Sequence, residues 1–143
     1  MIVLDTNVIS EMMRPPSIRS PAVYAWLREQ APDRMYTTVL SVAEIMGGVE
    51  VLPDGRRKDG IRGAAERVFA EMFPGRILLF DEAAARAYGA IIARQRKAGI
   101  AVGQFDIQIA AIAKTNGMAV ATRDTDFEEC EVPVVNPWGT HDL

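Results

Sequence analysis

The chain alternates short apolar runs with longer segments in which apolar residues recur at helical spacing. The short runs predict buried strands over residues 2–4, 35–39, 76–80, 118–122 and 132–135. The longer segments predict helices from about residue 8 to Pro15, over 21–29, 41–52, 61–72 and 81–98, and from 105 to 115. Strands that alternate with helices, with almost no hairpin turns, indicate an α/β fold. We therefore expect a central, mostly parallel sheet flanked by helices.

Length and composition place this pattern in one domain that spans residues 1–143. A domain usually holds about 100–200 residues, and a hydrophobic fraction of 49% is enough for one core. The single cysteine, Cys130, excludes an internal disulfide and fits a reducing compartment. The sequence has no apolar run near the ~20 residues of a membrane span, and its start lacks the pattern of a signal peptide. These features predict a cytoplasmic protein without membrane contact.

Acidic residues follow the predicted strands at the points where ligands bind in such folds. Asp5 comes directly after the first strand, and Asp124 follows the fourth with one intervening residue. Glu44 lies in the first turn of the helix after the second strand, and Asp106 lies near the start of the helix over 105–115. Ligands of parallel sheets bind beyond the carboxyl ends of the strands. The four carboxylates are therefore expected to converge on one edge of the sheet.

Such a convergence calls for a cation. Two carboxylates about 4 Å apart repel by roughly 4 kcal/mol at an effective dielectric near 20. Oxygen ligands without cysteine or a usable histidine favour Mg²⁺ or Mn²⁺ over zinc, since the one histidine, His141, lies two residues from the chain end. Acidic Mg²⁺ sites at a strand edge typically serve phosphoryl or phosphodiester chemistry.

Each acid also has a structural interpretation. Glu44 and Ser41 have the spacing of a capping box. Asp106 could favour a helix N-terminus, and Asp124 could begin a turn. Asp5 is the hardest to explain in this way, because the end of an apolar strand does not call for a charge. Taken together, the four positions favour a functional site.

The charge balance limits how the chain can bind nucleic acid. The formal net charge is −3, which argues against a protein that binds nucleic acid by backbone electrostatics alone. Basic residues cluster at 56–58 and 94–97, and such runs are more often solvated surface than binding sites. An enzyme with its acids gathered in a metal site remains compatible with this balance.

Four motifs, spread over nearly the whole chain, together resemble a known family. They are VLDTNVISE, SVAEIMGGV, FDIQIAAIAKTNG and ATRDTDFEECEVPVVNPW. The combination is similar to PIN-domain ribonucleases, and specifically to VapC-type toxins of type II toxin–antitoxin systems. The start, the length and the terminal NPW resemble the FitB-like branch.

The resemblance implies an endoribonuclease that depends on Mg²⁺ or Mn²⁺. The acidic positions of the family fall on Asp5, Glu44, Asp106 and Asp124, and its supporting polar positions on Asn7 and Thr122. By resemblance, Asp5 and Asp106 would be the principal metal ligands, and Asp124 would assist directly or through water. Glu44 would orient a water molecule or complete the coordination.

The resemblance also implies partners. Family members usually form homodimers and are neutralised by a small antitoxin encoded beside them, which often binds DNA as well. The implied substrate is RNA.

The last acidic position is open between two residues. Many relatives have one more residue before the Asp-Phe pair than the stretch TRDTDF provides, so Asp126 competes with Asp124. We favour Asp124, because it keeps its spacing from the strand over 118–122.

Two other functions deserve comparison with the nuclease. A phosphatase with an aspartate nucleophile needs a second acid at position 7, where this chain has Asn7. A phospho-accepting signalling module that binds Mg²⁺ needs a lysine on a late strand, but the last strand is followed by Asn136 and Pro137. Both alternatives therefore rank below the nuclease.

Overall fold

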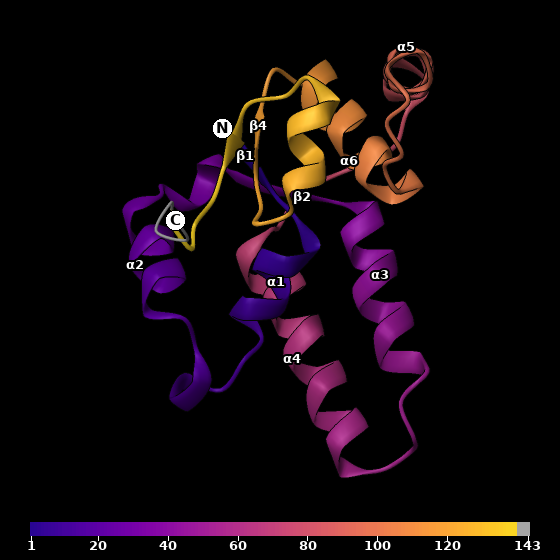
Figure 1. Cartoon of the computed structure of the whole chain (residues 1–143). Helices are drawn as coiled ribbons and strands as arrows, with labels where there is room; N and C mark the ends of the chain where they lie inside the picture. Colours follow the sequence, from indigo (N-terminus) through magenta and orange to yellow (C-terminus); the bar gives the residue numbers. More distant parts are fainter. Residues whose placement is uncertain (140–143) are drawn as a thin grey trace.

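The computed structural model describes residues 1–139, and its centre is a five-stranded sheet in the order β3-β2-β1-β4-β5 (Figure 1). All four pairings between neighbouring strands are parallel. The strands are β1 (Ile2–Leu4), β2 (Met35–Thr38), β3 (Ile77–Leu78), β4 (Ala119–Ala121) and β5 (Val134–Val135). The predicted α/β fold with a parallel sheet is thus confirmed.

In the described part of the chain, six α-helices connect and cover the strands. They are α1 (Thr6–Met12), α2 (Pro21–Glu29), α3 (Val39–Glu50), α4 (Arg56–Met72), α5 (Glu82–Ala98) and α6 (Gln104–Thr115). Short 3₁₀ helices are η1 (Pro16–Ile18), η2 (Pro32–Arg34) and η3 (Thr125–Cys130). Helices α3 and α4 lie side by side as a long pair that extends away from the sheet (Figure 1). Within residues 1–139, no helix combines the length and the apolar character needed to cross a membrane.

The two faces of the sheet bury separate hydrophobic clusters. Val3 and Val120 pack with α5, α6 and η3 on one face, whereas Leu4 and Ala121 pack with α1, α2 and α4 on the other. This division follows from the alternation of side chains along a strand. The sheet is therefore covered on both faces, as expected for parallel strands.

Several predicted boundaries differ from the observed ones. Helix α4 begins at Arg56, five residues before the predicted start at Ile61. Its first turn is mostly polar and carries no apolar signal, but it is held because Lys58 donates to the carbonyl oxygen of Glu50 at 3.0 Å. The predicted strand over 76–80 shortens to two residues, because it is an edge strand and Leu79 is exposed.

Helix α3 begins two residues earlier than predicted, and this changes the reading of Glu44. The predicted strand through Val39 ends at Thr38, whose hydroxyl accepts a hydrogen bond from the backbone N–H of Ser41 at 3.3 Å. Thr38 is therefore the N-cap, and Glu44 lies in the second turn rather than the first. The capping box that the spacing of Ser41 and Glu44 allows as a structural alternative is therefore not formed.

Candidate metal centre

Asp5 lies at the carboxyl end of β1 and is buried, with 4% of its surface exposed. Its backbone N–H donates to the carbonyl oxygen of Ala121 at 3.0 Å, so the β1–β4 pairing continues into the site. Its Oδ1 accepts from the backbone N–H of Thr6 at 2.7 Å, and its Oδ2 accepts from the hydroxyl of Thr122 at 2.7 Å. The carboxylate both begins α1 and faces the polar end of β4.

Thr122 connects three polar groups of the site. In addition to donating to Asp5, its Oγ1 accepts from Asn7 Nδ2 and from the backbone N–H of Asp124, each at 3.0 Å. Asn7 Nδ2 also lies 3.4 Å from Asp5 Oδ2. The two supporting positions, Asn7 and Thr122, thus lie directly beside the first acid.

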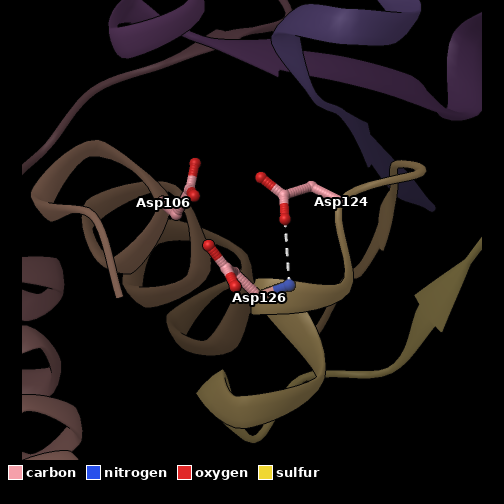
Figure 2. Close-up of side chains that lie close together, drawn as sticks. All are labelled: Asp106, Asp124 and Asp126. Atoms are coloured by element: carbon pink, nitrogen blue, oxygen red, sulfur yellow. Dashed lines mark hydrogen bonds between the residues drawn. The ribbon is translucent and has the colours of Figure 1, made fainter. Parts of the chain in front are cut away.

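Asp106, Asp124 and Asp126 form the compact part of the site (Figure 2). Each of them offers a carboxylate oxygen that lies within 4.8 Å of the other two. Asp106 comes from the first turn of α6, whereas the other two come from the start of η3. Asp124 accepts from the backbone N–H of Asp126 at 2.9 Å, which fixes their relative positions. The sequence leaves Asp124 and Asp126 as alternatives for one acidic position, but the structure places both of them beside Asp106.

Glu44 approaches the cluster from α3. Its Oε1 lies 3.0 Å from the hydroxyl of Thr6, and that hydroxyl is also 3.0 Å from Ser41 Oγ. The side chain of Glu44 is exposed, and its second oxygen has no hydrogen-bond partner within residues 1–139. Sequence reasoning missed Thr6, whose place between Asp5 and Asn7 in the DTN stretch was the available signal.

The acids influence one another's ionisation. Burial raises the pKa of Asp5 to about 6, and repulsion from Glu44 and Asp124 adds to the increase. Burial also raises the pKa of Asp106 to about 7, followed by repulsion from the other acids of the site. Those acids are Asp124, Asp5, Glu44 and Asp126, in decreasing order of effect. All four predicted acids therefore meet at one edge of the sheet, together with Asp126.

The donor set fits a hard divalent cation. Within residues 1–139, the Asp106 carboxylate accepts no hydrogen bond, so its oxygens are available to a ligand. The amide oxygen of Asn7 is buried and lacks a hydrogen-bond donor there. Carboxylate and amide oxygens are the ligands that Mg²⁺ and Mn²⁺ accept. His141, which the sequence places in the tail, lies outside the described residues.

Comparison with known proteins gives the chain its family. The PIN domain family matches residues 2–132. The chain is 43% identical over 141 residues to the plasmid stability protein StbB of Pseudomonas syringae pv. tomato, covering 96% of this chain and 99% of that protein. It is 39% identical over 139 residues to the VapC ribonuclease Y4jK of Sinorhizobium fredii, covering 96% and 98% of the two chains.

A third relative also has a solved structure. Toxin FitB of Neisseria gonorrhoeae is 42% identical over 140 residues, covering 96% of this chain and 99% of that protein. The crystal structure of FitAcB from the same organism superposes with a TM-score of 0.87 at 40% identity, covering 96% of this chain and 99% of the other. The chain therefore belongs to the PIN domain family, in the VapC-type group that includes Toxin FitB.

Proposed function

We propose that this protein is the toxin of a toxin–antitoxin pair and acts as a metal-dependent endoribonuclease. The observation that carries the proposal is the convergence of Asp5, Glu44, Asp106, Asp124 and Asp126 on one strand edge of a PIN domain. The similarity to a VapC ribonuclease supports RNA as the substrate. The similarity to Toxin FitB supports the role of a toxin.

In this proposal Asp5 and Asp106 hold Mg²⁺ or Mn²⁺, with Asp124 and Asp126 beside them. A bound ion of this kind supplies polarisation of a phosphate oxygen, a lower pKa of a water and compensation of charge on the leaving oxygen. The protein's own groups orient the reactants. Glu44, held by Thr6 through one carboxylate oxygen, presents the other to the attacking water and accepts its proton.

The rival enzyme function needs a group that the site does not supply. An aspartate-nucleophile phosphatase uses a second acid at position 7 to protonate the leaving group. Here the Asn7 amide donates to Thr122 and holds it beside Asp5, which is a positioning contact. An amide has no proton to give and recover in this way, so the geometry favours hydrolysis at the metal site.

Partners follow from the same relatives. Solved structures similar to this chain include FitAcB from Neisseria gonorrhoeae and FitAB bound to a DNA fragment. We propose that this chain likewise binds a cognate antitoxin and forms a homodimer. The product of a short reading frame directly upstream, added to the purified toxin, should abolish RNA cleavage in proportion to its amount.

Metal-dependent cleavage tests the function directly. The purified protein is incubated with transfer RNA, ribosomal RNA and a single-stranded messenger RNA fragment in Mg²⁺, in Mn²⁺ or in EDTA. Because the ligands are all oxygens, we expect cleavage with either ion and none in EDTA. The matched control is Glu66→Gln, which removes an exposed carboxylate from α4 and should cleave like the wild type. Full activity in EDTA would contradict the proposal.

A further inference from the structure

The NPW stretch that follows β5 forms a fixed turn against the core. The backbone N–H of Trp138 donates to Asn136 Oδ1 at 2.9 Å, and the N–H of Gly139 donates to the carbonyl oxygen of Asn136 at 3.0 Å. The indole of Trp138 packs, partly buried, against the cluster that α1, α2 and α4 build on their face of the sheet. The turn therefore holds an aromatic ring near the end of β4.

Arg123 lies over this ring, with its guanidinium carbon 4.6 Å from the ring centroid. The backbone on either side of Arg123 is also fixed. The N–H of Thr122 donates to the carbonyl oxygen of Val135 at 2.9 Å, and the N–H of Asp124 donates to Thr122 Oγ1 at 3.0 Å. An exposed arginine is thus held at both its backbone and its side chain.

The charge of Arg123 is not used by the site's acids. Arg123 directly precedes Asp124, yet within residues 1–139 its guanidinium forms no hydrogen bond or ion pair. Stacking uses the face of the guanidinium, so the N–H donors at its edge remain available. These donors match the oxygens of a phosphate.

A cation near an acidic site favours binding of a polyanion, and Arg123 directly precedes Asp124 in the chain. Five carboxylates converge here, and the chain as a whole carries a net charge of −3. A divalent ion does not cancel such a cluster, so the edge repels phosphates beyond the one at the metal. A cation that is already immobilised lowers the entropic cost of binding a flexible strand.

We propose that Arg123, held by Trp138, binds a backbone phosphate of the RNA next to the bond that is cut. Arg123 is then a substrate-binding residue and Trp138 a positioning residue, which assigns a role to the NPW motif. The proposal rests on the proposed ribonuclease function. The alternative is that the stacked pair only fastens the C-terminal turn to the sheet.

Five variants separate these roles. Arg123→Gln removes the charge, and Arg123→Lys keeps it without the planar edge. Trp138→Phe keeps an aromatic face, whereas Trp138→Leu removes it. The control, Arg86→Gln, removes an exposed charge from α5 and so changes the net charge by the same amount.

The melting temperature of each variant is recorded, and two measurements with RNA are made. One is kcat and KM for a short single-stranded RNA in Mg²⁺ over a range of salt. The other is binding of the same RNA in EDTA, followed by fluorescence anisotropy over the same range of salt.

For Arg123→Gln we expect KM to rise roughly tenfold, with kcat within about twofold of the wild type. The slope of log affinity against log salt should fall by about 0.7, the value for one phosphate contact on a single strand. Arg123→Lys should keep the slope, because its charge remains. Trp138→Leu should raise KM as much as Arg123→Gln does. Trp138→Phe should keep KM near the wild-type value, because its ring still supports Arg123. Arg86→Gln should leave KM and the slope unchanged.

The proposal is overturned if Arg123→Gln keeps the wild-type KM and salt slope. A lower melting temperature with those values unchanged would show that the pair only fastens the turn. Arg123 is exposed, so its variants should fold. They show whether Arg123 binds phosphate even if Trp138→Leu does not fold. If the wild type cleaves no RNA in Mg²⁺ or Mn²⁺, the ribonuclease function fails, and the salt slope in EDTA still decides whether Arg123 binds phosphate.

Discussion

At the scale of single residues, small hydroxyl and amide groups organise the carboxylates. Thr122 joins Asp5 to the start of η3, and Thr6 joins α1 to Glu44. These groups add no charge to a crowded site, and their hydrogen bonds position Asp5, Asp124 and Glu44. The acids themselves are therefore free to act as ligands.

The role of Glu44 is tested by Glu44→Gln. Thr38 caps α3, so the substitution should change the free energy of unfolding by no more than about 0.5 kcal/mol. An amide cannot accept the proton of a water, so the cleavage rate should fall by about 100-fold or more at saturating Mg²⁺. Thr6→Val, which loses only the hydroxyl that holds Glu44, should lower the rate less. A near wild-type rate for Glu44→Gln would show that the carboxylate takes no part in the reaction.

Repulsion among the carboxylates around Asp106 predicts that its removal abolishes cleavage without lowering the stability of the metal-free protein. Asp106→Asn removes a carboxylate whose pKa is raised by burial and by its neighbours. The variant should lose cleavage, and in EDTA its melting temperature should equal or exceed that of the wild type, because a repulsion is relieved. A sharp drop in the melting temperature would identify Asp106 as a structural residue.

The acidic positions could be predicted at this scale, but their contacts could not. The ends of the strands locate Asp5 and Asp124, since parallel strands end at a common edge. That Asp126 lies in the cluster depends on the tight 3₁₀ turn after Asp124, which the spacing of acids does not reveal. Similarly, Thr6 contacts Glu44 across a gap of 38 residues that only the fold closes.

At the scale of the elements, the sequence predicts helices well where a polar cap or a proline marks the start. Helix α2 begins at Pro21 and ends at Glu29, as its pattern predicts. Helix α3 differs because Thr38 can end a strand or cap a helix, and both uses fit its neighbours in sequence. Thr38 does both: its backbone is extended (φ −127°, ψ 160°) as the last residue of β2, and its hydroxyl caps α3 by accepting from the N–H of Ser41.

Thr38→Ala tests this start of α3. Losing the cap should cost about 1 kcal/mol in the free energy of unfolding, measured by urea denaturation of the metal-free protein. Ser41→Ala is the matched control, because within residues 1–139 the hydroxyl of Ser41 caps no helix and hydrogen-bonds only with Thr6. If Ser41→Ala lowers the free energy of unfolding more than Thr38→Ala does, Ser41 and not Thr38 is the N-cap of α3.

At the scale of the whole molecule, the carboxylates at the edge of the sheet make the free energy of unfolding depend on pH. In the folded protein the pKa values of Asp5 and Asp106 are raised to about 6 and about 7, from the ordinary value of 3.8. Between about pH 4 and pH 7 the folded state thus binds more protons than the unfolded state at these two groups. Their contribution to stability is present at low pH and is lost as the pH rises through this window.

Thermal melts in EDTA between pH 4.5 and 7.5 measure this coupling. The wild-type melting temperature should fall relative to that of Asp106→Asn as the pH rises. Added Mg²⁺ should raise the wild-type melting temperature most at the high end, where protons no longer compete for the ligands. A difference between wild type and Asp106→Asn that does not vary with pH would contradict the raised pKa of Asp106.

The pairing of β1 with β4 also controls when the protein can first act. Asp5 and its partner Thr122 lie 117 residues apart in the chain, and the acids of η3 come after Thr122. Until β4 docks beside β1, the nascent chain has no complete set of ligands. Under the proposed function, the growing chain therefore cannot cleave RNA until the strand that leads to Thr122 has been made and has paired with β1.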